Sequence, residues 1–170
     1  MRSFAPRLRG RQSVIRYLPV AACLALLTAC SPAKPQAEFS PGLDMIELMA
    51  HVVDPAAFQL WRGAGTEVTE AGERDLSPTT EEGWKVVEDG AATLAEAGNL
   101  LMLPGRPRAP EADWNRHAKL LTVRALEAKA AAKAKDKQAV FDTGGRVYEV
   151  CTACHAQFVI APQEAAEAKK

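Results

Sequence analysis

Hydrophobic and small residues recur at alternating spacings of three and four along four stretches of the chain, in residues 46–60, 84–101, 114–132 and 140–158. This spacing places the apolar residues of each stretch on one face of an α-helix. The predicted core faces consist of Ile46, Met49, Val53, Ala56 and Leu60; Trp84, Val87, Ala91, Leu94, Gly98 and Leu101; Trp114, Ala118, Leu121, Ala125, Ala128 and Ala132; and Val140, Gly144, Val147, Cys151, Cys154 and Phe158. No stretch alternates between apolar and polar residues over a useful length, so the pattern predicts helices and no strands.

Cap and turn residues separate the predicted helices. Thr79, followed by Glu82 three residues later, has the arrangement of a capping box at the start of the second helix. The segment LPGRPRAP, residues 103–110, is a break that no helix crosses, and KAKDKQ, residues 133–138, is a shorter one. The second and third helices therefore have two defined ends each, and the fourth has a defined start.

Short connections favour packing of successive helices in opposite directions. Such helices bury their apolar faces most economically in an all-α, antiparallel up-down-up-down four-helix bundle, which is the predicted fold. Pro55 interrupts the first helix and predicts either a kink or a restart with Asp54 as the cap. The longest connection, residues 62–78, is acidic and contains glycine, and we expect it to be a solvated loop.

The beginning of the chain has the pattern of an export signal. Its first 16 residues contain five arginines and no acidic residue, and the run from Tyr17 to Ala29 is apolar. That run is shorter than the ~20 residues that a membrane-spanning helix needs, but it has the length of the hydrophobic part of a signal peptide. Residues 1–29 are therefore predicted to direct export, which makes the mature protein periplasmic.

Cys30 follows this apolar run directly. The preceding Leu27, Thr28 and Ala29 complete a segment that resembles the bacterial lipobox, in which the cysteine is acylated and becomes the first mature residue. Ordinary cleavage just beyond, for instance after Ala33, is the alternative. We expect the lipoprotein, in which several acyl chains hold the domain on a membrane. The predicted parts are a signal in residues 1–29, a Pro-rich tether in 30–41, the four-helix bundle in 42–162 and a tail in 163–170.

Removal of the signal makes the protein acidic. The whole chain has 21 basic and 21 acidic residues, and removing the five arginines of the signal leaves 16 basic residues against 21 acidic ones. An acidic exported domain is a poor binder of nucleic acid, so no nucleic-acid partner is expected.

The chemistry of the predicted bundle is concentrated in one motif near the end of the chain. Cys151, Cys154 and His155 form the pattern C-x-x-C-H, which attaches a c-type haem through two thioether bonds. Cys151 and His155 lie four residues apart, so they share one face of the last helix. The sequence therefore predicts one covalent haem c, with His155 as the proximal ligand of the iron.

Three other uses of the motif are less favoured. A redox dithiol usually opens a helix after a strand, and no strand pattern precedes Cys151. A zinc site needs four ligands, and the other histidines, His51 and His117, provide no second pair at a suitable spacing. A disulfide between Cys151 and Cys154 would be strained within a helix.

Two glycines lie within the last helix, where glycine lowers stability. Gly144 and Gly145 therefore predict a close approach of the backbone to the haem or to a neighbouring helix. Three aromatic residues at helical spacing, Trp84, Trp114 and Tyr148, are expected in the core, with a place at the edge of the haem as the alternative.

A haem-attachment motif on the last helix of a four-helix bundle resembles cytochrome c′ and its low-spin relatives, the class II cytochromes c. The resemblance covers about residues 40–161 and is specific at the motif. It implies that Cys151 and Cys154 hold the haem and that His155 binds the iron. The segment ELMA matches the place where low-spin members supply a methionine, which makes Met49 the candidate sixth ligand.

The sequence departs from the family pattern at one position. Family members commonly have a basic residue four positions after the axial histidine, where this chain has Val159. That position belongs to the environment linked to gas chemistry, so the departure weakens a nitric-oxide-binding interpretation. Many members are dimers through their first two helices, and the exposed faces of this chain leave open whether it forms a homodimer.

The expected function is haem-mediated electron transfer by a membrane-tethered cytochrome of the bacterial cell envelope, with a redox protein as partner. The chain has no H-E-x-x-H, G-x-S-x-G or Walker-type motif, so no enzyme is expected. A gas-binding (NO or CO) or sensing protein with a five-coordinate iron is the alternative. A haem-free thiol-disulfide protein is the third and most remote class.

Overall fold

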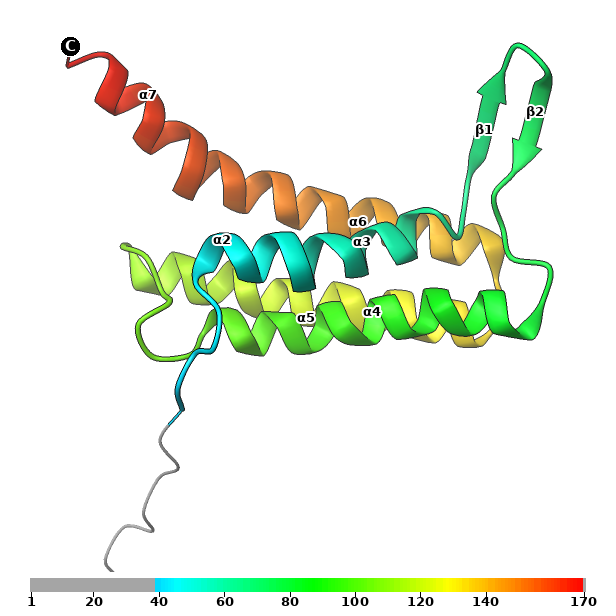
Figure 1. The fold of residues 1–170 in the computed structure, drawn as a ribbon, viewed down its shortest axis with the longest axis horizontal. Coiled ribbons are helices and arrows are strands. Elements are labelled where there is room, and N and C mark those ends of the chain that lie inside the picture. Colours follow the sequence, from blue (N-terminus) through cyan, green and yellow to red (C-terminus); the bar gives the residue numbers. More distant parts are fainter. Residues whose placement is uncertain (1–38, 170) are drawn as a thin grey trace, which may run out of the picture. The chain divides into compact units, whose positions relative to one another are not determined.

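A computed structural model of the protein describes residues 39–169, which are mainly helical (Figure 1). Its helical segments are α2 (Met45–Leu48), the π-helical turn η2 (Met49–Val53), α3 (Asp54–Trp61), α4 (Glu81–Leu101), α5 (Glu111–Lys133), α6 (Lys137–His155), the π-helical turn η3 (Ala156–Ile160) and α7 (Ala161–Glu167). The prediction of a mainly helical protein is confirmed. The predicted signal and Cys30 lie outside the described residues. No helix within residues 39–169 combines the length and the apolar character needed to cross a membrane.

A β-hairpin corrects the expectation of no strands. β1 (Thr66–Thr69) pairs antiparallel with β2 (Gly72–Asp75) and projects from the helices (Figure 1). Every residue of both strands is exposed. With no buried face, the hairpin has no reason to alternate between apolar and polar residues, so the pattern that predicts strands is absent. The hairpin is held by its backbone ladder and by an exposed ion pair between Arg74 and Glu67, at 2.7 Å.

The helix ends agree with the predicted breaks, with a shift of one residue at α4. Its cap is Thr80, whose hydroxyl accepts a hydrogen bond from the Gly83 amide at 3.1 Å, so the prediction of Thr79 as the cap is wrong. Asp136 caps α6 by accepting from the Ala139 amide at 3.0 Å. The predicted breaks after the second and third helices are both present.

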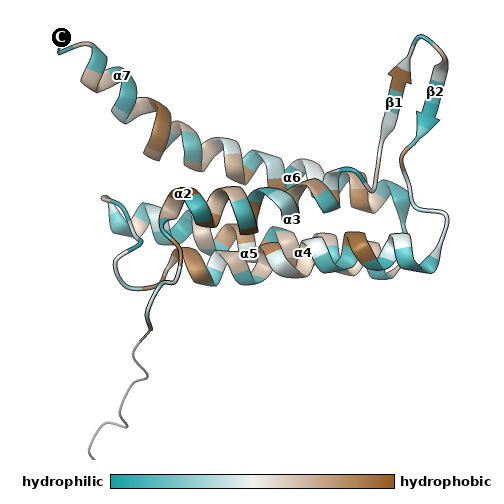
Figure 2. Ribbon diagram, in the orientation of Figure 1, coloured by the Kyte–Doolittle hydropathy of each residue, from teal (hydrophilic) through white to brown (hydrophobic). Residues whose placement is uncertain are grey.

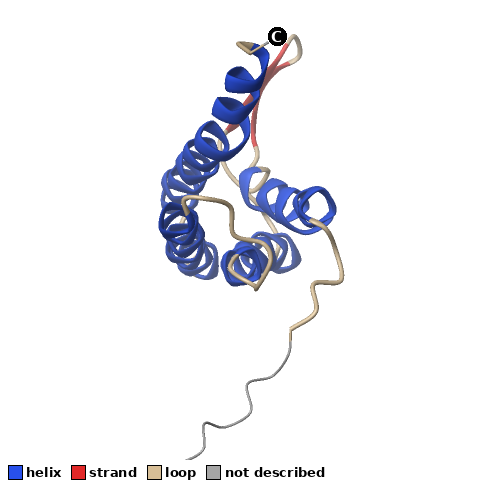
Figure 3. Cartoon of the chain, turned by 90° about the vertical axis from the view of Figure 1, so that its left-hand side faces the viewer, coloured by secondary structure: helices blue, strands red, loops and turns tan. Residues whose placement is uncertain are grey.

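The predicted core faces of α4 and α5 are buried along their whole length. Viewed nearly end-on in Figure 3, the long helices lie side by side, and hydrophobic positions recur between polar ones along each of them in Figure 2. α4 packs against α3 and α5, and α5 packs against α6. α3 also reaches α6, because the Trp61 indole Nε1 donates to the Gly144 carbonyl at 3.0 Å.

Glycine allows the closest contact between α4 and α5. The Thr122 hydroxyl donates to the Ala95 carbonyl at 2.8 Å. A Cβ atom added at Gly98 would lie 2.2 Å from Thr122 Oγ1 and 2.6 Å from the Ala118 carbonyl oxygen. Because a carbonyl oxygen of the facing helix cannot move independently, only glycine fits at this position.

We expect Gly98→Ala to lower the free energy of unfolding by about 1–3 kcal/mol, because the added methyl group overpacks the contact between α4 and α5. Gly145→Ala is the matched control, since a Cβ atom at Gly145 would meet nothing within 4 Å. That change should raise stability by about 0.5–1 kcal/mol through the better helix propensity of alanine. Urea denaturation followed by circular dichroism measures both changes, and equal effects would contradict this account.

The two glycines of α6 have different roles. The Gly144 carbonyl accepts from Trp61, and a Cβ atom at Gly144 would lie 3.4 Å from that indole, so the predicted close approach is to a neighbouring helix. Gly145 is exposed, and the same prediction is wrong for it.

Proline follows each of the two π-helical turns. In η2 the Asp54 amide donates to the Met49 carbonyl, and in η3 the Ala161 amide donates to the Ala156 carbonyl, five residues back in both cases. Pro55 and Pro162 come next and have no amide hydrogen to donate. The chain thus passes from α2 into α3 with helical backbone angles, and the alternative prediction that Asp54 caps a restarted helix is wrong.

Candidate functional site

A groove of about 1020 Å³ lies between the segment α2–η2–α3 and the segment α6–η3–α7. Its volume is at the upper end of the ~300–1,000 Å³ that is typical of small-molecule sites. In Figure 1 the end of α6 and α7 lead away from α2, whereas α3 and the middle of α6 are in contact. The groove therefore opens where the first and last helices separate.

The predicted core faces remain incompletely buried at this groove. Leu60 and Val147 are fully buried (0%) where the first and last helices touch, but Ile46 is 78% exposed, so its predicted place in the core is wrong. Met49, Cys151 and Cys154 are only half-buried, and all of them line the groove. Apolar surface is costly to leave in water, so this end of the protein is suited to an apolar ligand.

The motif residues lie together on the wall formed by the last helix. Cys151, Cys154 and His155 occupy the final turns of α6, and all three line the groove. Met49 lines the opposite wall, on η2, with Met45 one turn earlier. The structure therefore brings the predicted haem-attachment residues and the candidate sixth ligand to one cavity. His51 is exposed and does not line it.

The two cysteines are free thiols with raised pKa values. Burial raises the pKa of Cys151 from its ordinary value of 9.0 to about 11, with smaller contributions from Cys154 and Asp54. Burial also raises the pKa of Cys154, against the opposing effect of Arg108. Reactive redox cysteines have lowered pKa values, so these thiols lack the environment of a redox dithiol.

We expect Cys151 in folded, haem-free protein to react with iodoacetamide about 100-fold more slowly at pH 8 than in urea-unfolded protein, because the thiolate is the nucleophile. A raised pKa keeps the thiol protonated at pH 8, so the rate should increase as the pH rises towards 11. Mass spectrometry of alkylated peptides measures the two rates. Equal rates at pH 8 would show that the thiol is not desolvated.

Residues of α5 and η3 form one end of the groove. Trp114 and Phe158 pack edge to face with ring centres 5.1 Å apart, and His117 meets the same Phe158 ring at 6.1 Å. The Gln157 amide donates to an Asp113 carboxylate oxygen at 3.0 Å, and its oxygen faces His117 Nε2 at 3.1 Å. Since a carboxylate only accepts, this orientation of the amide requires that His117 Nε2 carry a hydrogen.

The sequence alone did not reveal some residues that line the groove. Arg108 lies in a segment recognised only as a break, and Trp61 follows the last residue of its predicted core face. Tyr148 was expected in the core but is 58% exposed at the groove, where it meets Trp61 edge to face at 5.8 Å. A tryptophan one position beyond an apolar face was the available signal for Trp61, whereas Arg108 had none.

The residues of the groove fit a covalently held haem. Two thiols and one imidazole lie on one wall, a thioether lies on the other, and the remaining walls are largely apolar. A porphyrin supplies four nitrogen ligands to its iron, so one or two protein ligands complete the site. Among residues 39–169, no three His, Cys, Asp or Glu side chains are grouped so that they could hold a metal ion by themselves.

Comparisons with family models, with curated proteins and with solved structures found no match to this chain. The groove and the motif beside it are therefore the features that indicate a function.

Proposed function

We propose that the protein is a c-type cytochrome that carries electrons. One haem c is attached to Cys151 and Cys154 in the groove, with His155 as the proximal iron ligand and Met49 as the sixth. The observation that carries this proposal is that the groove and the C-x-x-C-H motif lie in the same part of the protein. The groove opens between the beginning of the first helical segment and the end of the last one, and the C-x-x-C-H motif lies on its wall.

Each part of the groove has a physical role in this function. The haem would supply an iron that accepts and releases one electron. The two cysteines fix its position, and the apolar walls exclude water from it. Met49 provides a neutral ligand, which enters an apolar site without the cost of a buried charge and favours the reduced state.

The proposal includes the antiparallel four-helix bundle of class II cytochromes c. Contacts of α3 with α4, α4 with α5, and α5 with α6 support it. The hydrogen bond from Trp61 to the Gly144 carbonyl links α3 to α6 and completes the ring of contacts.

We propose an unidentified redox protein as the partner, and the resemblance also suggests a homodimer.

Gas binding to a five-coordinate iron is the second candidate. It is favoured by Ile46, whose exposed apolar side chain lines the same wall as Met49. If Ile46 faced the iron in place of Met49, the sixth position would be open. Val159, where the family commonly has a basic residue, counts against this candidate. The raised pKa of Cys151 counts against a thiol-disulfide protein.

The visible spectrum tests the proposed function. Protein matured in a host that assembles c-type cytochromes should show the sharp absorption bands of a reduced c-type haem, and the colour should remain with the protein in acidified acetone. The same spectrum distinguishes a low-spin from a high-spin iron. Protein that acquires no haem in such a host would contradict the proposal.

We propose that lipid on Cys30 holds the protein at a membrane of the cell envelope. Cys30→Ser should release it into the soluble periplasmic fraction, because the hydrophobic anchor is lost. Cell fractionation and intact mass measure the change. Wild-type protein that is already soluble, with an N-terminus beyond Cys30, would contradict the anchor and leave a soluble periplasmic protein.

A further inference from the structure

Arg108 reaches into the groove from the connection between α4 and α5. One terminal nitrogen of its guanidinium, Nη1, donates to the Phe158 carbonyl at 3.0 Å. The guanidinium carbon lies 5.9 Å from the centre of the Trp114 ring. Two contacts thus hold Arg108 at the end of the groove where Trp114 and Phe158 pack together.

The carbonyl that Arg108 uses is available because of a proline. In an α-helix the Phe158 carbonyl would accept from the amide four residues later, but that residue is Pro162, which has no amide hydrogen. The π-helical turn η3 and Pro162 therefore leave an acceptor at the groove, and the guanidinium satisfies it.

Most of the hydrogen-bonding capacity of Arg108 is still unused. A guanidinium has five N–H donors, and only Nη1 has a hydrogen-bond partner in the described structure. No described carboxylate forms an ion pair with Arg108, whereas Arg74, Arg116 and Arg124 each have one. Within residues 39–169, Arg108 is the only lysine or arginine that lines the groove. The described lining of this mainly apolar groove therefore carries one arginine, the exposed Arg108, and one carboxylate, Asp54 on the α3 wall.

We propose that Arg108 binds a carboxylate of the ligand in this groove, and so selects an apolar, planar ligand that carries acidic groups. This inference rests on the proposed function, since haem has two propionate carboxylates. An arginine offers a carboxylate two parallel hydrogen bonds, which give direction as well as strength. The contact with the Phe158 carbonyl fixes the guanidinium before the ligand arrives, which lowers the entropic cost of binding.

The test compares two forms of one probe. Iron mesoporphyrin has ethyl groups in place of the vinyl groups of haem and cannot form thioethers. Full-length protein without haem is titrated with the diacid and with its dimethyl ester, and binding is followed by visible absorption. The wild type should bind the diacid about tenfold more tightly than the ester, because a hydrogen bond to a charged group is among the stronger ones.

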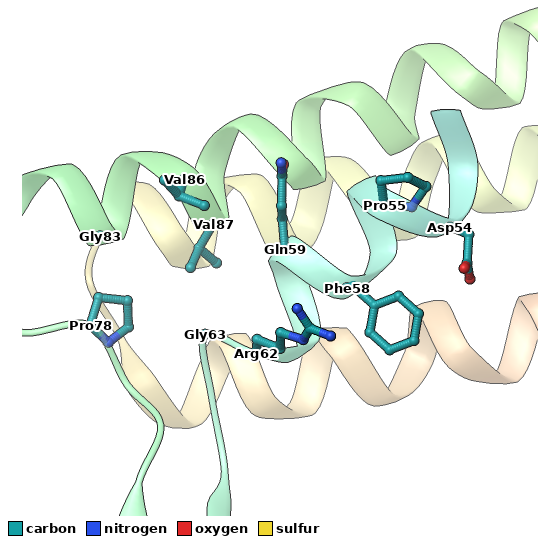
Figure 4. Close-up of a pocket in the computed structure, with 10 residues that line it drawn as sticks. All are labelled: Asp54, Pro55, Phe58, Gln59, Arg62, Gly63, Pro78, Gly83, Val86 and Val87. Atoms are coloured by element: carbon teal, nitrogen blue, oxygen red, sulfur yellow. The ribbon is translucent and has the colours of Figure 1, made fainter. Parts of the chain in front are cut away.

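Variants of Arg108 test whether this residue causes the preference for the diacid over the ester. Arg108→Gln should reduce it to about twofold or less, and Arg108→Lys should keep part of it, since the charge remains without the planar fork. Arg62→Gln is the matched control. Arg62 also lies over an aromatic ring, with its guanidinium carbon 5.0 Å from the centre of Phe58, but it lines a separate hollow of about 650 Å³ (Figure 4). This variant should keep the full preference, and circular dichroism verifies that each protein is folded.

The outcomes separate this inference from the proposed function. Equal affinity of the wild type for diacid and ester, or a full preference in Arg108→Gln, overturns the role of Arg108 and leaves the proposed function standing. If Arg62→Gln also loses the preference for the diacid, the role of Arg108 is overturned, because the preference would then reflect the net charge of the protein. Failure of the wild type to bind either form contradicts the groove as a haem site, and the role of Arg108 with it.

Discussion

Replacing both Cys151 and Cys154 by alanine is expected to abolish covalent haem attachment completely. Each thioether needs a sulfur atom, and the structure describes no other cysteine at the groove. Protein from a host that assembles c-type cytochromes is denatured, separated by electrophoresis and stained for haem. The wild type should retain haem in the denatured band, and the double variant should show none.

Single variants provide the control for this result. Cys151→Ala or Cys154→Ala keeps one sulfur, so each should retain a single thioether or a reduced amount of attached haem. Both thiols are only half-buried, and their loss should leave the helix content of the double variant unchanged. Haem that remains covalently bound in the double variant, or a wild type that releases all of its haem into acidified solvent, would contradict the assigned attachment site.

Replacing Met49 by alanine is expected to convert a low-spin ferrous iron to the high-spin state and to open it to carbon monoxide. Met49 lines the wall opposite Cys151 and His155, and it is half-buried. Its thioether is a soft, neutral donor that suits the iron of a c-type cytochrome. Loss of this ligand leaves the sixth position empty, which absorption spectra with and without carbon monoxide detect.

Met45→Ala is the matched control for Met49→Ala. Met45 lies one turn earlier on the same wall, and its replacement by alanine removes a side chain of the same size. The control should keep the low-spin spectrum if Met49 is the ligand. Wild-type protein that is already high-spin would show that Met49 only packs in the groove, since methionine is also a common filler of irregular apolar space. The gas-binding candidate would then be favoured.

The sequence by itself determined the long helices and the local C-x-x-C-H motif on which the proposed chemistry depends. The faces of α4 and α5 could be predicted residue by residue, because a helix that is buried on one side must repeat its apolar positions every three or four residues. The C-x-x-C-H motif is equally local, since Cys151, Cys154 and His155 lie within five consecutive residues. The breaks between the long helices depended on proline, glycine and polar residues in short segments.

Only the tertiary structure decided where the helices separate. Ile46 and Leu60 belong to the same apolar face, yet Ile46 is 78% exposed and Leu60 is fully buried (0%). The difference arises because α6 contacts α3, at the end of the first helical segment. It diverges from α2, at the beginning of that segment, where the groove lies. A periodic pattern states which side of a helix is apolar, but it contains no information on how far away the next helix lies.

The same limit applies to the other features that the sequence did not reveal. The strands β1 and β2 have no buried face, so they left no pattern to detect. Gly144 and Gly145 are identical neighbours in sequence, and only the position of Trp61 gives one of them a contact. Arg108 becomes part of the groove because Pro162, 54 residues later, leaves the Phe158 carbonyl without a helical partner. Such pairings depend on distances in space, which the order of residues along the chain does not specify.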